Sequence, residues 1–274
     1  MEIKEISLNG SDYRYLEFPN PGKPKILLIH GVIVESHCWE RVIPLLQPDY
    51  HIYAIDQKGH GQSSRGKSYI DDYTPEIIAG DLFDFYKKVI QEPFFLAGHS
   101  LGGQFCMAYA ALHSDTLKKL VIMESLPSLT IKALLALRVV HKATPTVFPD
   151  KQSVSNFYDL AQIQGLSDYM LQYAMVQNDE GGYELSYDKD HIHPRSLMGM
   201  RARNKYLWRS IPKISVPTLI VKAEKSIIID QKMSLKMKRL LKESEIIEIK
   251  GSGHELVFGF PKEVAQALKT FFSR

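Results

Sequence analysis

A serine between two glycines is the first candidate for chemistry in this chain. The pattern Gly98-x-Ser100-x-Gly102 follows an apolar run, Phe94–Ala97, and precedes a helix-like stretch, Gln104–His113. In a sharp strand-to-helix turn of this kind the serine hydroxyl projects above the sheet edge as a nucleophile. Side chains at positions 98 and 102 would collide with the neighbouring strand and helix, and the helix N-terminus favours developing negative charge beside the serine. The pattern therefore predicts a nucleophilic Ser100.

The elements that must position this serine are short apolar strands alternating with helices. Nearly continuous apolar runs indicate strands buried on both faces of a parallel sheet. Six such runs are Ile26–Ile29, His51–Ile55, Phe94–Ala97, Leu120–Met123, Thr218–Val221 and Glu245–Ile249. The alternation predicts an α/β fold with a mostly parallel, doubly wound sheet of about eight strands.

Local signals refine the edge of the sheet and one helix. Asn9-Gly10 separates the runs Glu2–Leu8 and Tyr13–Phe18 and predicts an antiparallel hairpin at the sheet edge. Thr74-Pro75 reads as an N-cap followed by proline at the first position of a helix that extends to about Gln91.

The strand–helix rhythm stops between about residues 127 and 212. This segment is rich in Leu, Met, Tyr and His at helical spacings, and it contains Gly181-Gly182. An insertion of this length between two strands predicts a helical cap over a core formed by residues 1–126 and 213–274. Several cap residues are equally expected to line the substrate pocket or to form the cap's own core: Met170, Leu171, Tyr173, Met175, Met198 and Met200. Trp39, by contrast, is expected in the core.

Composition excludes several other classes of protein. Hydrophobic residues make up 45% and charged residues 24% of the 274 residues, and the net charge of +3 is small. We therefore expect no nucleic-acid surface, and no apolar run approaches the length of a membrane span. Cys38 and Cys106 form no metal or redox spacing, which favours a cytoplasmic protein with reduced thiols. No phosphate loop or metal cluster is evident, so no cofactor is expected, and the oligomeric state is not readable.

Four motifs together resemble the α/β-hydrolase superfamily over essentially the whole chain. They are His30-Gly31 after an apolar strand, Asp56-x-x-Gly59-x-Gly61-x-Ser63, the Gly98–Gly103 segment around the serine, and Gly253-His254 near the C-terminus. The resemblance implies that His254 is the general base. It also implies that the backbone N–H groups of Val32 and Leu101 form the oxyanion hole. His99 and His60 are expected to be structural, His60 by holding the turn from Asp56 to Ser63.

The acid of the triad departs from the usual pattern of the superfamily. Most members carry an aspartate where this chain has Ser226, and serine cannot supply the charge. Met123-Glu124 resembles the segment of haloalkane dehalogenases and of a coelenterazine luciferase in which the glutamate is the triad acid. A carboxylate at the end of a core strand also needs a partner. We therefore expect Glu124 to be the acid, with Asp230 and Glu224 as alternatives.

The resemblance implies a serine hydrolase without cofactor that acts on a small apolar carboxylic ester, in the manner of a carboxylesterase or lipase. Dehalogenases and epoxide hydrolases of the superfamily use aspartate at the position of Ser100, so the serine indicates an acyl-enzyme instead. A thioesterase and a carbon–carbon bond hydrolase remain open. So does a small-molecule receptor that retains the triad, and haloperoxidase activity is a minor alternative. The natural substrate is not readable from the sequence.

Overall fold

An eight-stranded sheet forms the centre of the molecule in the computed structural model, which describes residues 1–192 and 197–274. The strands are β1 Glu2–Leu8, β2 Ser11–Phe18, β3 Lys25–Ile29, β4 His51–Ile55, β5 Phe94–His99, β6 Leu117–Met123, β9 Thr218–Ala223 and β10 Ser244–Ile249. Their order is β1-β2-β4-β3-β5-β6-β9-β10, and all pairs from β4 to β10 are parallel. The predicted α/β-hydrolase fold and its mostly parallel sheet are confirmed.

The hairpin at the sheet edge follows from its turn residues. β1 and β2 are antiparallel, and Asn9 and Gly10 both adopt positive φ, 47° and 82°. Two consecutive left-handed residues match the right-handed twist of the flanking strands, which is why Asn-Gly is favoured there.

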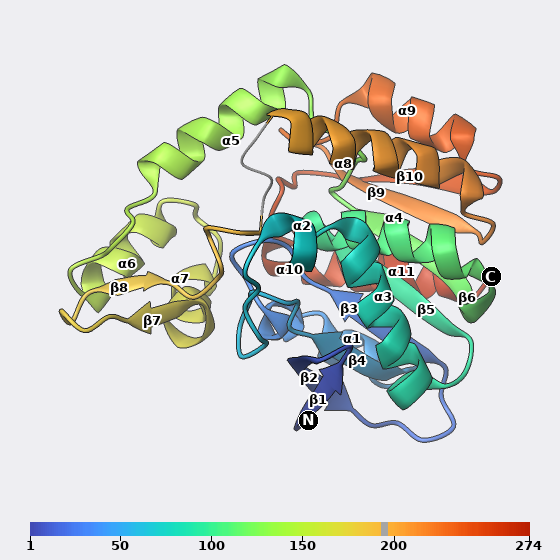
Figure 1. Ribbon diagram of the computed structural model, residues 1–274, viewed down its shortest axis with the longest axis horizontal. Helices are drawn as coiled ribbons and strands as arrows, with labels where there is room; N and C mark the ends of the chain where they lie inside the picture. The colour runs from blue at the N-terminus through green and yellow to red at the C-terminus, as the bar shows by residue number, and fades with distance from the viewer. Residues whose placement is uncertain (193–196) are drawn as a thin grey trace.

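Helices cover both faces of the sheet, so two buried clusters form instead of one. One face carries α3 Pro75–Phe85 and α4 Leu101–His113, and the other carries α1 Ile43–Leu46, α10 Leu256–Gly259 and α11 Pro261–Phe272 (Figure 1). Thr74 caps α3 by accepting a hydrogen bond from the N–H of Ile77, as predicted. Trp39 lies in the 3-10 helix η1 Ser36–Trp39 and is fully buried in the cluster on the face that carries α1, α10 and α11. This confirms its place in the core.

The segment between β6 and β9 lies outside the sheet. It contains α5 Ile131–Ala143, α6 Lys151–Asp159, α7 Leu166–Tyr169, the π-helix η4 Met170–Ala174, β7 Met175–Gln177, β8 Tyr183–Leu185 and α8 Leu197–Ser210. Figure 1 shows α6, α7, β7 and β8 as a lobe beside the core, with α5 bridging from the core to that lobe.

Two features of this segment differ from a purely helical cap. β7 and β8 form a small antiparallel hairpin that turns through Gly181-Gly182. Three-residue strands are too short to show an alternating pattern, so the spacing of apolar residues did not indicate them. α8 packs against α4 of the core. The division into a core and a cap of residues 127–212 therefore stays a prediction.

Candidate active site

Ser100 occupies a strained turn between β5 and α4. Its backbone angles are φ 53° and ψ −118°, a conformation that side chains rarely adopt. The flanking glycines permit this turn. A Cβ on Gly98 would lie 2.6 Å from the carbonyl oxygen of Gly102, and one on Gly102 would lie 2.5 Å from that of Ile29 on β3. The predicted steric reason for both glycines is thus confirmed.

Three side chains from distant parts of the chain meet above this turn. His254 follows β10, and its Nε2 lies 3.1 Å from Oγ of Ser100. Nδ1 of the same ring lies 3.2 Å from Oε2 of Glu124, which directly follows β6. This chain of hydrogen bonds has the geometry that lets a histidine take the proton of a serine hydroxyl while a carboxylate orients the ring.

Glu124 is fully buried and has every oxygen partnered. The backbone N–H of Ala223 donates to Oε1 at 2.8 Å, and the hydroxyl of Ser226 donates to Oε2 at 2.7 Å. Ser226 therefore stands where an aspartate was expected and holds the carboxylate that Glu124 supplies from the neighbouring strand.

The two alternative acids lie in other contacts. Asp230 accepts a hydrogen bond from the N–H of Met233 and caps α9 Gln231–Leu240. Glu224 accepts from the N–H of Gly251 at 2.8 Å and forms an ion pair with Lys250. Neither carboxylate hydrogen-bonds to His254 in the described part of the chain.

The pKa values of two neighbouring histidines are shifted in opposite directions. Burial opposes the charged form of His254, but its hydrogen bond to Glu124 and the negative charge of Glu255 raise its pKa overall. Burial lowers the pKa of His99 to about 4. Neutral His99 lies with Nε2 2.8 Å from the carbonyl oxygen of His254, so it fixes the loop that carries the catalytic candidate. This contact agrees with the structural role expected for His99.

The candidate oxyanion donors flank Ser100. Leu101 is the first residue of α4, where a backbone N–H has no partner within the helix. Val32 and Leu101 line the same cavity as Ser100. Ile33, which follows Val32, has φ 64°, and this backbone angle is an outlier for a residue with a β-branched side chain. Such strain persists only where surrounding contacts enforce it.

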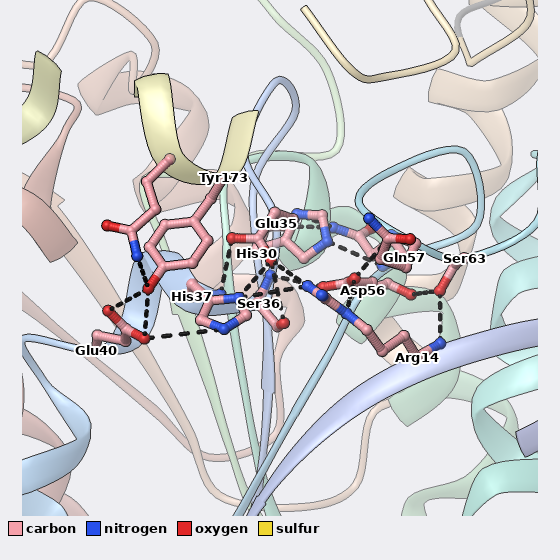
Figure 2. Close-up of polar contacts among 12 residues, drawn as sticks. Arg14, His30, Glu35, Ser36, His37, Glu40, Asp56, Gln57, Ser63 and Tyr173 are labelled. Carbon is pink, nitrogen blue, oxygen red and sulfur yellow. Dashed lines mark hydrogen bonds and ion pairs between the residues drawn. The ribbon is translucent and has the colours of Figure 1, made fainter. Parts of the chain in front are cut away.

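A buried cluster of charges lies beside this loop and includes Glu35 and Ser36, and sequence reasoning missed most of it. Arg14 on β2 donates from Nε to Asp56 at 2.8 Å and from Nη2 to Glu35 at 2.7 Å, as Figure 2 shows. Asp56 also accepts from the N–H of Ser36 at 2.9 Å. Burial opposes ionisation of Asp56, but Arg14 and Ser36 together hold its pKa below the ordinary value. Only the Asp56 turn had a recognisable motif, because the other partners come from separate segments without a shared spacing.

The same cluster joins the loop that carries Val32 to the segment between β6 and β9. The hydroxyl of Tyr169 on α7 accepts from the N–H of Glu35 at 2.8 Å and donates to its Oε1 at 3.1 Å. The ring of Tyr173 stacks on His37, with centroids 4.1 Å apart (Figure 2). α7 and η4 are therefore in direct contact with the residues that follow Val32.

A cavity of about 230 Å³ opens over Ser100 and His254. Its walls are mostly apolar, and they are formed by Leu126, Leu129, Leu137, Val140 and Ile228, with Arg203 and Glu255 as charged members. A larger hollow of about 670 Å³ lies at the β10–α11 edge, away from these residues, and is lined by charged side chains such as Glu248 and Lys262. The chemistry therefore points to the smaller cavity.

The six cap residues considered for the pocket lie elsewhere among the described residues. Met170 and Met175 are buried in the core cluster, and Leu171 and Tyr173 pack against it. Met198 is 81% exposed, and Met200 lines a separate small hollow. Of the two alternatives left open, pocket or core, the core position fits Met170, Leu171, Tyr173 and Met175, and in the described part of the chain none of the six lines the cavity over Ser100. The cavity takes its apolar lining from α5 and the loop before it instead.

Comparison with known proteins agrees with this fold. Residues 24–261 match the family described as alpha/beta hydrolase fold, and the chain belongs to this family. It is 25% identical to the 2-hydroxy-6-oxo-6-(2'-aminophenyl)hexa-2,4-dienoic acid hydrolase of Metapseudomonas resinovorans, over 98% of this chain and 90% of that protein. It is also 21% identical to a human monoacylglycerol lipase, over 100% of this chain and 82% of that protein.

Solved structures show the same architecture. The thioesterase domain from the curacin biosynthetic pathway superposes with a TM-score of 0.79 at 24% identity, covering 100% of this chain and 99% of that one. At this identity the likeness shows the fold. Taken together, the family and its relatives identify the chain as an alpha/beta hydrolase.

In the described part of the chain, no helix has the length and apolar character needed to cross a membrane.

Proposed function

We propose that this protein is a serine hydrolase that cleaves a carboxylic ester of a small, largely apolar molecule through an acyl-enzyme. The observation that carries the proposal is the continuous hydrogen-bond chain Ser100–His254–Glu124 at the floor of an apolar cavity. In this proposal Ser100 is the nucleophile, His254 the general base and Glu124 the acid that orients the histidine.

Each step of the reaction has a residue to carry it. His254 takes the proton of Ser100 as the hydroxyl oxygen attacks the ester carbonyl. The oxyanion that forms is bound by the N–H groups of Val32 and Leu101, and Glu124 stabilises the charged imidazole. His254 then gives its proton to the leaving alcohol, and water hydrolyses the acyl-enzyme by the same sequence.

A thioester is the second candidate, because it would form the same acyl-enzyme with the same groups.

Kinetics with 4-nitrophenyl esters from acetate to octanoate test the proposal. We expect turnover of at least one of them, and a fall in kcat of roughly 10³- to 10⁶-fold for Ser100→Ala because the nucleophile is lost. Ser273→Ala, which changes an exposed serine near the C-terminus, is the matched control and should keep wild-type turnover.

Two results would overturn the proposal. Turnover that survives in Ser100→Ala would place the chemistry elsewhere. Binding of the esters without any turnover by the wild-type protein would favour a receptor.

A further inference from the structure

The cavity above Ser100 is lined by an arginine that forms no ion pair with any carboxylate of the described residues. Arg203 lies on α8 and lines the same cavity as Ser100 and His254. Its Nε is sealed from solvent and has no hydrogen-bond partner. Within the described part of the chain, no carboxylate forms an ion pair with Arg203.

Two other largely buried cations of the described residues are compensated. Arg14 lies between the carboxylates of Glu35 and Asp56, and Nζ of Lys58 lies 3.2 Å from Asp81. Among the described residues, the phenol of Tyr69 is the group that acts electrostatically on Arg203. Burial lowers the pKa of Arg203, yet a guanidinium stays protonated at neutral pH in proteins. An uncompensated buried charge is costly, and arginines that face a pocket in this state are candidates for function.

The acids that share the cavity are not available to Arg203. Glu124 is held by His254, Ser226 and the N–H of Ala223. Glu255 also lines the cavity but forms no ion pair with the guanidinium. An anionic group of a bound molecule is therefore the partner that the site lacks.

We propose that Arg203 binds a carboxylate of the substrate, so that the enzyme prefers esters that carry one carboxylate beside the scissile bond. This inference rests on the proposed serine hydrolase function and names the substrate class. One guanidinium balances one monoanion, whereas a phosphate dianion would add a further negative charge to a cavity that Glu124 and Glu255 also line. The planar fork of Arg203 also matches the two oxygens of a carboxylate.

The position of Arg203 leaves room for such a group. Arg203 and Leu129 also line a hollow of about 140 Å³ next to the first cavity. Arg203 thus borders both the cavity of about 230 Å³ beside Ser100 and the hollow of about 140 Å³ next to it. An ester bound at Ser100 can place its reacting carbonyl in the cavity over Ser100 and its carboxylate at the boundary with the smaller hollow.

Two matched ester pairs test the inference, because the carboxylate can lie on either side of the ester bond. Mono-4-nitrophenyl glutarate is compared with 4-nitrophenyl valerate, and 4-(butyryloxy)benzoate with phenyl butyrate. We expect the wild-type enzyme to favour the anionic member of at least one pair in kcat/KM. In Arg203→Gln that preference should fall by roughly 10- to 100-fold, and Arg203→Lys should retain part of it. Arg209→Gln, an exposed arginine on the same helix, should leave the ratio as in the wild type.

A binding measurement separates this inference from the proposed function. Glutaric acid monoanilide is titrated calorimetrically into Ser100→Ala with and without Arg203→Gln. A loss of affinity of at least about tenfold in Arg203→Gln supports the inference, whether or not any ester is turned over. The absence of turnover for every ester would overturn the proposed function and leave the inference standing. Ester turnover with equal anionic-to-neutral ratios in wild type and Arg203→Gln, for both pairs, would overturn the inference alone. Equal affinity of the two proteins for the anilide would also overturn it.

Discussion

At the scale of single residues, the candidate acid is the informative feature of this molecule. A serine at position 226 removes the carboxylate from its usual place, and the buried Glu124 lies one strand away with its oxygen 3.2 Å from His254. The hydroxyl of Ser226 donates to that same carboxylate. The absence of aspartate at 226 could be read from the sequence, but the hydrogen bond between Ser226 and Glu124 could not, because 102 residues separate them.

Substitution of the two carboxylates tests which one serves as the acid. Glu124→Gln should lower kcat by about 10³- to 10⁴-fold, because an amide cannot stabilise the charged imidazole and disfavours the required tautomer. Asp230→Asn should keep kcat within about threefold, since asparagine still caps α9. Steady-state kinetics on one 4-nitrophenyl ester measure both. Full activity in Glu124→Gln together with loss in Asp230→Asn would assign the acid to Asp230.

At the scale of elements, the strands and the nucleophile turn could be predicted because each carries a local pattern. The runs that predicted β3 to β6 and β9 and β10 lie within those strands, since all of them except the edge strand β10 are buried along most of their length. The loop cluster of Arg14, Glu35 and Asp56 has no such pattern, and its partner Tyr169 lies 134 positions after Glu35. Contacts of this kind depend on the assembled fold, so periodicity and motifs do not indicate them.

The hydrogen bond between Tyr169 on α7 and Glu35, in the loop that carries Val32, predicts a specific effect of Tyr169→Phe. Loss of the hydroxyl leaves the buried N–H of Glu35 without its acceptor. We expect the free energy of unfolding to fall by about 1–3 kcal/mol, as measured by urea denaturation, together with a lower kcat. Tyr173→Phe is the control, because its hydroxyl lies 3.3 Å from the half-exposed Glu40 and should matter less. Equal effects of the two substitutions would argue against a special role for the Tyr169 contact.

At the scale of the whole molecule, buried histidines make the fold sensitive to acid. His30 is fully buried, and burial lowers its pKa to about 4, as it does for His99. In the unfolded chain both have pKa values of about 6.5. Below that pH the unfolded chain binds protons that the folded chain does not, so stability is lost as the pH falls from about 6.5 towards 4. His254 acts in the opposite sense because its pKa is raised.

The contribution of His30 can be measured directly. When the pH is lowered from 7.5 to 5, protonation of His30 in the unfolded chain should lower the free energy of unfolding of the wild-type protein by about 2 kcal/mol. In His30→Gln this part of the pH dependence should disappear, whatever the stability of the variant at pH 7.5. Urea denaturation at both pH values gives the comparison. An unchanged difference between the two pH values in His30→Gln would contradict the assignment.

The most direct measurement of the central claim is the site of covalent trapping by a fluorophosphonate. The nucleophile displaces fluoride and keeps the phosphonyl group, so mass spectrometry of the intact protein and of its peptides locates the reacting atom. The account predicts a single adduct on the peptide that contains Ser100, no adduct in Ser100→Ala, and much slower labelling in His254→Ala. An adduct on another residue, or an unlabelled wild-type protein that still hydrolyses esters, would contradict it.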